Sequence, residues 1–317
     1  MKKVLITGGC GFIGSALVKK LVKNGNKVKV LDNCSRGSAS RLKNILDDIE
    51  FIQGDIRDFS VVSKACEDIE QIHHLAYING TENFYKKPEL VLDVAASGII
   101  NLYNCCKEKQ IEEFYLASTS EVYQTPTKFP AAEDERLIIP DIMNPRYSYG
   151  GGKILCELVA MHCIQKLVDK LIIYRPHNVY GPDMGNEHVI PQFFIKMKKL
   201  IEEFGLNKII NFPIQGSGDE TRSFIHINDF IKGIEIIINK GENNQIYHIG
   251  NSDEVSIKKL ATIISKTLDV KIEIKQGELQ LGSTMRRCPD INKISSLGYR
   301  QTISLESGIA SLKGWYY

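Results

Sequence analysis

The chain has 317 residues, with 40 lysines and arginines against 38 aspartates and glutamates and a formal net charge of +2. A chain of this length can bury a large core, either as one large α/β domain or as one domain with a smaller lobe. Because the charges are balanced and form no basic block, the sequence argues against nucleic acid or an anionic membrane as a partner.

The eight cysteines stand mostly within apolar runs and show no paired C-x-x-C spacing. We therefore expect reduced, buried thiols and no metal site. Only three apolar residues separate Lys3 from the first glycines, which is too short for the core of a signal peptide. No apolar run approaches membrane-spanning length. The sequence thus predicts a soluble, cytoplasmic protein.

The first strand, turn and helix have the pattern of a dinucleotide-binding unit. Val4 to Ile6 is a short apolar strand, and Ser15 to Lys23 has the apolar spacing of a helix. The turn between them lets the backbone approach a pyrophosphate and directs the helix N-terminus toward its charge. The predicted cofactor-binding residues of this turn are Gly8, Gly11, Phe12, Ile13 and Gly14.

A second strand, Lys27 to Leu31, leads into Asp32 and Asn33. Asp32 follows the glycines by about 20 residues, where a carboxylate can bind a ribose 2′-hydroxyl. Because this carboxylate repels a 2′-phosphate, it favours NAD over NADP, although Arg36 lies close in sequence and could accept that phosphate.

Two further strands, Glu50 to Gln53 and Gln71 to Leu75, continue the pattern. After the first of them, Asp55 and Ile56 are expected to meet the adenine, and Asp55 could instead cap a helix. Leu75 and Ala76 stand where a cofactor phosphate or ribose passes. The neighbouring His73 and His74 are interpreted as packed strand residues rather than ligands.

An amphipathic helix within residues 86–109, entered at Pro88, is long enough to pair two subunits. A fifth strand, Glu113 to Ala117, precedes Ser118-Thr119-Ser120-Glu121. Ligands of doubly wound sheets bind at the carboxyl ends of strands, and hydroxyls with a carboxylate can bind a sugar and exchange protons with carbon. The same residues could equally form a simple capped turn.

Tyr149 and Lys153 stand four positions apart at the start of an apolar run to Leu167 that reads as a helix. That spacing places both side chains on one helix face. An ammonium beside a phenol favours the phenolate, so we predict for Tyr149 a pKa well below the usual value of about 10. Such a base could remove a proton from a sugar hydroxyl, although this spacing also occurs by chance in many helices.

After a sixth strand, Lys170 to Tyr174, the alternation becomes irregular between residues 183 and 227. Later elements are a helix from Asn228 to Asn239, a strand from Gln245 to Ile249, and a helix capped by Ser256. We predict a doubly wound, mostly parallel α/β (Rossmann) sheet with a smaller, interleaved C-terminal lobe. In this prediction residues 1–180 form the NAD-binding domain, and the chain comes back to this domain at about residues 226–250. Residues 181–225 and 251–317 form the lobe that binds the nucleotide sugar.

The ordered set of motifs resembles the extended short-chain dehydrogenase/reductase family, and more narrowly its nucleotide-sugar epimerases, dehydratases and decarboxylases. The motifs are Gly8-Gly-x-Gly-x-x-Gly14, Asp32, Ser118-Thr-Ser-Glu121, Tyr149-x-x-x-Lys153, Arg175-Pro-x-Asn-Val-Tyr-Gly-Pro182, Arg222-Ser-Phe-Ile-His226 and Pro289-Asp-Ile291. The resemblance implies a tightly held NAD and oxidation of a hexose at C4, with Tyr149 as base, Lys153 and Thr119 as its partners, and Asn178 and Arg222 at the diphosphate of a nucleotide sugar. It also implies a homodimer through the helices of residues 88–108 and 149–168.

Glu121 distinguishes the reactions within that group. After C4 oxidation a carboxylate there could remove the C5 proton, so we expect 4,6-dehydratase-type chemistry. The alternatives are a UDP-glucuronate decarboxylase, toward which Pro145-Arg146 leans and for which Arg286 or Arg287 could hold the substrate carboxylate, a 4-epimerase, and a non-catalytic NAD-binding regulatory protein. Three residues depart from the family pattern: Tyr77, Ala95 and Gln124.

Overall fold

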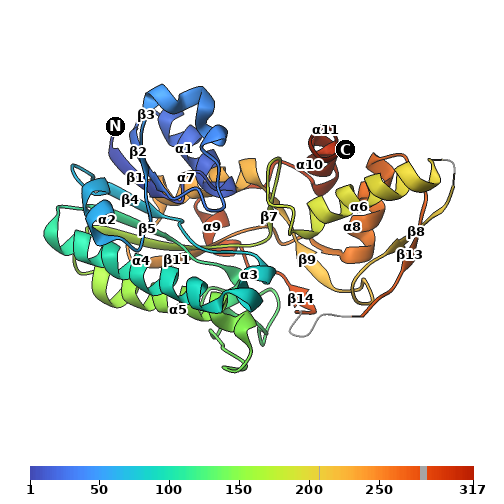
Figure 1. The fold of residues 1–317 in the computed structure, drawn as a ribbon. Coiled ribbons are helices and arrows are strands. Elements are labelled where there is room, and N and C mark those ends of the chain that lie inside the picture. Colours follow the sequence, from blue (N-terminus) through green and yellow to red (C-terminus); the bar gives the residue numbers. More distant parts are fainter. Residues whose placement is uncertain (207, 279–283) are drawn as a thin grey trace.

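The computed structural model describes residues 1–206, 208–278 and 284–317. Within these residues a seven-stranded parallel sheet has the order β3-β2-β1-β4-β5-β6-β11 (Figure 1). The order reverses between β1 and β4, which is where ligands of doubly wound sheets bind. The strands are β1 (Lys3–Thr7), β2 (Lys27–Asp32), β3 (Ile49–Gln53), β4 (Gln71–His74), β5 (Glu113–Ala117), β6 (Lys170–Pro176) and β11 (Gln245–Ile249).

Helices cover both faces of the sheet, as the sequence predicts. Because a sheet covered on both faces must bury both sets of side chains, its strands are nearly continuous apolar runs. One apolar core joins the sheet to α2 (Phe59–Ala65), α4 (Pro88–Glu108) and α5 (Ser148–Val159). A second core joins the other face to α1 (Phe12–Lys23) and α7 (Ile227–Lys240).

The C-terminal lobe has a separate apolar core. Its main helices, α6 (Val189–Phe204) and α8 (Ile257–Thr267), lie beside the sheet at the right of Figure 1. Ser256 caps α8 by accepting a hydrogen bond from the Lys259 amide, as predicted. The remaining strands and helices are β7 (Val179–Tyr180), β8 (Ile210–Pro213), β9 (Thr221–Ser223), β10 (Ile225–His226), β12 (Glu254–Ser256), β13 (Ile272–Lys275), β14 (Arg286–Arg287), α3 (Thr81–Lys86), α9 (Asn292–Ser296), α10 (Leu305–Ser311) and α11 (Lys313–Tyr316).

Two features differ from the sequence reading. Ile294 of α9 and Tyr299 are buried in the core of the sheet rather than in that of the lobe, so we propose that residues 292–299 belong with the NAD-binding domain. The helix predicted to run to Leu167 is regular only to Val159 and continues as a π-helical turn, Ala160–Ile164.

The cysteines and the two histidines of β4 are mostly buried, as the sequence predicts. All eight cysteines lie within the described residues and are free thiols, six of them buried. His73 and His74 are packed in β4, and the ring of His73 stacks on Tyr115. Among the described residues, no helix combines the length and the apolar character needed to cross a membrane.

The first turn of α7 is tied to the C-terminal segment by Asp229. Its buried carboxylate accepts hydrogen bonds from the amides of Thr302 (2.9 Å) and Ile303 (2.8 Å). Burial by itself raises the pKa of this carboxyl, but the hydrogen bonds from Thr302 and Ile303 outweigh burial and lower it. The resulting stability is present above the unfolded-state pKa of about 4 and is lost as the pH falls through the lower folded-state pKa.

We therefore expect Asp229→Asn to lower the free energy of unfolding at pH 7 by about 1.5–3 kcal/mol, because hydrogen bonds to a charged acceptor are lost. Urea unfolding followed by circular dichroism measures this change. The exposed Asp253→Asn is the control. Equal urea midpoints for the two variants would show that Asp229 does not hold this junction.

Candidate active site

The glycine turn after β1 forms a backbone cradle that fits a cofactor diphosphate. Gly8 has a φ of +76°, and a Cβ there would lie 2.7 Å from the Ala76 nitrogen. A Cβ at Gly14 would lie 2.1 Å from the Gly8 carbonyl oxygen. The N-cap residue of α1 is Gly11, and no side chain among the described residues caps this end of the helix. Its free amides and positive dipole end are suited to a phosphate anion.

The predicted adenosine-binding residues line a cavity next to this turn, at the carboxyl ends of β2, β3 and β4. They are Asp32, Asn33, Asp55, Ile56, Leu75 and Ala76. Hydrogen bonds from Arg57 hold the Asp55 carboxylate and lower its pKa to about 2, with help from Asn33. The alternative role of Asp55 as a helix cap is wrong, because Asp58 caps α2.

A second cavity, of about 420 Å³, contains all four predicted catalytic residues: Thr119, Glu121, Tyr149 and Lys153. It also contains the glycine turn, so cofactor and substrate would share one space. Thr119 caps a short 3-10 turn (Ser120–Val122) after β5, and Tyr149 and Lys153 come from the first two turns of α5. The residues after β5 and the Tyr149–Lys153 pair of α5 therefore line the same cavity, as the sequence predicts.

Two aromatic rings hold the Tyr149 side chain. Phe84 stacks on it with ring centroids 4.8 Å apart, and Tyr77 meets it edge-on at 5.2 Å. The Lys153 ammonium lies 4.0 Å from the centroid of the Tyr77 ring and donates a 2.7 Å hydrogen bond to the Ala117 carbonyl. Tyr77 therefore contacts both members of the Tyr-Lys pair.

The predicted lowering of the Tyr149 pKa is wrong for the protein alone. Burial raises the pKa of Tyr149 to about 12, and contact with the Thr119 hydroxyl only partly opposes it. Burial also lowers the pKa of Lys153 to about 8. The sequence argument considered the charges of the lysine and of the nicotinamide but not burial, and removal of both side chains from water disfavours their charged forms.

Glu121 forms an ion pair with Arg287, with 2.5 Å between Oε1 and Nη1. The two residues are 166 positions apart, and both line the larger cavity. Burial alone raises the pKa of the Glu121 carboxyl, but the positive charges of Arg287, Arg146 and Arg222 outweigh it and leave the pKa below its usual value. The charges of three arginines therefore act on one carboxylate, and Arg287 is the one that contacts it.

The remaining predicted substrate residues lie close to this charge cluster. Asn178 lines the cavity and donates a hydrogen bond to the Ser223 carbonyl. Arg222 is not among the residues lining either cavity, and its guanidinium donates to the Thr221 carbonyl at 2.7 Å. Burial, together with the charge of Arg287, lowers the pKa of Arg222 to about 10.

Sequence reasoning missed three residues of the site. Phe84, Tyr77 and Arg146 were not predicted as site residues, although Tyr77 and Arg146 were noted for their sequence context. The Nε of Arg146 is buried and has no hydrogen-bond partner among the described residues. Phe84 gave no signal in the sequence, and the contacts that Phe84 and Tyr77 make with Tyr149 depend on the packing of α3 and of the loop after β4.

Comparison with known proteins identifies the family of this chain. Residues 4–250 match the model of the NAD dependent epimerase/dehydratase family. The chain belongs to that family.

Three similar proteins are named for different reactions. A protein of Methanocaldococcus jannaschii named "Putative UDP-glucose 4-epimerase" is 31% identical over 98% of this chain and 97% of its own length. UDP-glucuronic acid decarboxylase 1 of Xenopus tropicalis is 29% identical, over 97% of this chain and 70% of that protein. A solved dTDP-glucose 4,6-dehydratase of Streptomyces venezuelae, with NAD bound, superposes with a TM-score of 0.86 at 26% identity, covering 99% of this chain and 96% of that one.

Family membership confirms the predicted resemblance, the Rossmann-type fold and NAD as the cofactor. The protein is an NAD-dependent enzyme of the epimerase, dehydratase and decarboxylase class. The glycine turn and Asp32 are the residues that would hold NAD. The glycine that the family usually has at position 124 has a structural basis, because Gln124 has a φ of +53°, a conformation that glycine adopts without strain. The structure does not explain the glutamine.

We expect NAD to bind at least about tenfold more tightly than NADP, a difference of about 1.4 kcal/mol, because Asp32 would face a 2′-phosphate. Arg36, which could offset this repulsion, is paired with Glu187 at 3.4 Å. Titrations of both cofactors measure the ratio. Arg36→Ala should weaken only the residual NADP binding, and equal affinities in the unaltered protein would contradict the role given to Asp32.

Proposed function

We propose that this enzyme decarboxylates a nucleotide hexuronate after oxidising its sugar at C4. The observation that supports this most strongly is the Glu121–Arg287 ion pair in the cavity that also holds Tyr149. Arg146 and Arg222 add two further positive charges around the same carboxylate. The cluster therefore has an excess of positive charge, which suits a substrate that brings a carboxylate and a diphosphate.

The first step uses the Tyr149 phenolate to remove the proton of the C4 hydroxyl. NAD held by the glycine turn would supply the acceptor for the C4 hydride, and its positive charge would favour the Tyr149 phenolate. Thr119 lies in the same cavity and can donate a hydrogen bond to the C4 oxygen. Lys153, with Nζ on the Ala117 carbonyl, adds positive charge to this end of the cavity.

The second step needs no base at C5. In a 4-keto uronate the bond between C5 and C6 breaks, its electron pair moves toward the C4 oxygen, and carbon dioxide leaves. Tyr149, now protonated, and Thr119 can donate hydrogen bonds to the negative charge that develops on that oxygen. Arg287 would orient the C6 carboxylate. C5 of the resulting enolate then takes up a proton from solvent. Return of the hydride to C4, with the Tyr149 proton going back to the C4 oxygen, would leave a nucleotide pentose and restore NAD.

Dehydration is the second candidate, because Glu121 lies in the cavity where a C5 base would be needed. The structure supports it less well. The three arginines lower the pKa of Glu121, and a carboxylate with a lowered pKa is a weaker base. In a decarboxylase the arginine charges would bind the substrate carboxylate. In a dehydratase the same charges would weaken Glu121 as the base that removes the C5 proton.

Incubation with UDP-, GDP-, CDP- and dTDP-linked hexoses and hexuronates, followed by mass spectrometry, tests this proposal. We expect one hexuronate to lose the mass of carbon dioxide. Loss of the mass of water from a hexose would instead indicate a dehydratase, and a product of unchanged mass but new retention time would indicate an epimerase.

We also infer a homodimer formed through α4 and α5, which pack against each other along the sheet (Figure 1). Four large apolar side chains on these helices are exposed: Leu92 and Ile100 on α4, and Leu155 and Leu158 on α5. Their spacings of eight and three residues place each pair on one helix face. Pairing with a second copy would bury this surface.

Leu158→Glu should therefore shift the protein from dimer to monomer, because a charge would be buried at the interface. Light scattering at micromolar concentration measures the mass. Leu46→Glu, which changes an exposed leucine away from α4 and α5, is the control. A monomeric unaltered protein would contradict the inference.

A further inference from the structure

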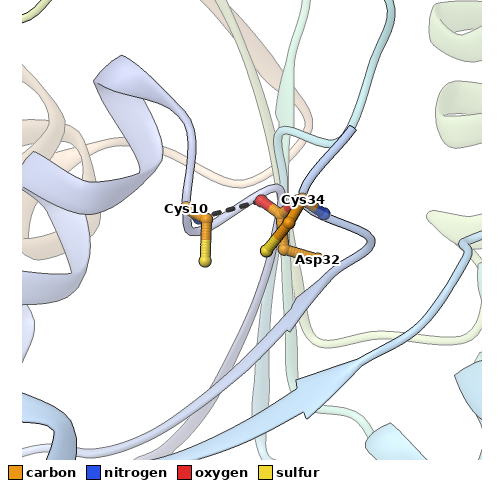
Figure 2. Close-up of side chains that lie close together, drawn as sticks. All are labelled: Cys10, Asp32 and Cys34. Carbon is orange, nitrogen blue, oxygen red and sulfur yellow. Dashed lines mark hydrogen bonds between the residues drawn. The ribbon is translucent and has the colours of Figure 1, made fainter. Parts of the chain in front are cut away.

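Two cysteines lie close together next to residues that line the adenosine cavity (Figure 2). The sulfur atoms of Cys10 and Cys34 and a carboxylate oxygen of Asp32 all lie within 4.8 Å of one another (Figure 2). Cys10 belongs to the glycine turn, and Cys34 follows β2. None of the roles assigned to the site uses either thiol.

Asp32 holds the two cysteine backbones together. One carboxylate oxygen accepts a 2.8 Å hydrogen bond from the Cys10 amide, and the other accepts a 2.8 Å hydrogen bond from the Cys34 amide. A disulfide requires Cα atoms roughly 4.4–6.8 Å apart. Because both amides bind one carboxylate and the two sulfurs lie within 4.8 Å of each other, a small movement of the loop would be enough to join them.

The two thiols differ in exposure. Cys10 is fully buried, and burial, together with the charge of Asp32, raises its pKa to about 12. Cys34 is only partly buried, so it is the more accessible of the two residues to a small oxidant. Cys34 is therefore suited to react first, and Cys10 to react with the oxidised Cys34.

We propose that Cys10 and Cys34 are a redox modification site at which a peroxide forms a disulfide that weakens NAD binding. In the first step the Cys34 sulfur attacks one peroxide oxygen, the O–O bond breaks, and water leaves to give a sulfenic acid. In the second step the Cys10 sulfur attacks the Cys34 sulfur, the S–O bond breaks, and a second water leaves. Two thiols are oxidised and the peroxide is reduced to two waters.

The effect on NAD follows from the loop between Asp32 and Gly37. Asn33, Ser35, Arg36 and Gly37 from this loop line the adenosine cavity. A disulfide draws the sulfurs to about 2.05 Å, so the loop must move toward the glycine turn. It is already in contact there, because a Cβ at Gly37 would lie 2.5 Å from the Cys10 carbonyl oxygen. The cross-link should therefore narrow the ribose site.

Thermodynamic linkage makes the effect reciprocal: if the disulfide weakens NAD binding, bound NAD must oppose the disulfide by the same factor. Coupling of this kind typically amounts to about 5- to 150-fold. The inference depends on NAD as the cofactor but not on which sugar reaction the enzyme catalyses.

The test treats the reduced, NAD-free protein with hydrogen peroxide and then counts thiols by alkylation and mass spectrometry after denaturation. We expect two fewer reactive thiols, a peptide cross-linked through Cys10 and Cys34, and recovery of both thiols with dithiothreitol. Added NAD should slow the reaction. The oxidised protein should bind NAD at least about fivefold more weakly in a titration.

Cys34→Ser should form no cross-link and keep its NAD affinity after peroxide treatment. Cys163→Ser, which changes the other partly buried cysteine, should behave like the unaltered protein. The proposal is overturned if the peptide map shows no Cys10–Cys34 cross-link, or if the cross-linked protein binds NAD as tightly as the reduced protein.

Discussion

Tyr149→Phe should reduce turnover by about 10²–10⁴-fold, the usual contribution of a general base, and should abolish the transient NADH absorbance. Phenylalanine keeps the packing against Phe84 and Tyr77 while removing the hydroxyl, so the fold should not change. NAD should still bind, because the glycine turn is untouched. Stopped-flow absorbance and a cofactor titration measure the two properties separately.

Tyr147→Phe is the matched control for this substitution. Tyr147 is two residues away, in the short turn Pro145–Tyr147, and is not among the residues that line either cavity. It should retain normal turnover. If Tyr149→Phe also retained normal turnover, Tyr149 would not be the base, and the proposed C4 oxidation would need another proton acceptor.

Arg287→Gln should lower kcat/KM for the hexuronate by about 10²–10³-fold, comparable to the loss of one preorganised electrostatic contact in other enzymes. The carboxylate of the substrate loses its cation, and Glu121 loses its ion-pair partner. Steady-state kinetics with the substrate identified from the panel measure this effect, and differential scanning fluorimetry checks that the variant is folded.

The neighbouring Arg286 provides a control of the same residue type. Its guanidinium is half-exposed and pairs with Glu254 outside the two cavities. Arg286→Gln should therefore leave kcat/KM close to normal. Similar losses for Arg286→Gln and Arg287→Gln would show that general surface charge, rather than a contact in the cavity, accounts for the effect.

Glu121→Gln separates the two leading reactions. In a decarboxylase this variant should keep substantial turnover, because carbon dioxide leaves without removal of the C5 proton. In a dehydratase it should accumulate NADH and stop, because C4 is oxidised but the C5 base is missing. Rapid-scan absorbance with mass analysis of the products distinguishes these outcomes, and accumulation of NADH would contradict the decarboxylase proposal.

The sequence predicted most of the sheet and the cofactor site because their signals are local. The strand, glycine turn and helix around Gly8 to Gly14 lie within about two dozen residues, and the apolar spacing of each element is set by its own backbone period. The same locality explains the correct cap at Ser256. By contrast, Asp55 and Asp58 are both plausible caps, and only the packing of α2 decides between them.

The chemistry at the sugar could not be predicted in the same way, because its decisive contacts are not local. Glu121 was correctly singled out, but its partner Arg287 lies 166 positions away and reaches the cavity through the short strand β14. The Tyr149 pKa depends on burial, which the Tyr149–Lys153 spacing does not reveal. The Cys10–Cys34 contact likewise arises only because Asp32 joins two turns.

The most direct test of the central claim is the fate of C6 in a nucleotide hexuronate labelled there with ¹³C. UDP-glucuronate is the first substrate to use, followed by the GDP, CDP and dTDP compounds. With the unaltered enzyme and NAD, we predict release of labelled carbon dioxide in step with formation of a nucleotide pentose. A product that retains the label, or turnover of nucleotide hexoses alone, would contradict the account.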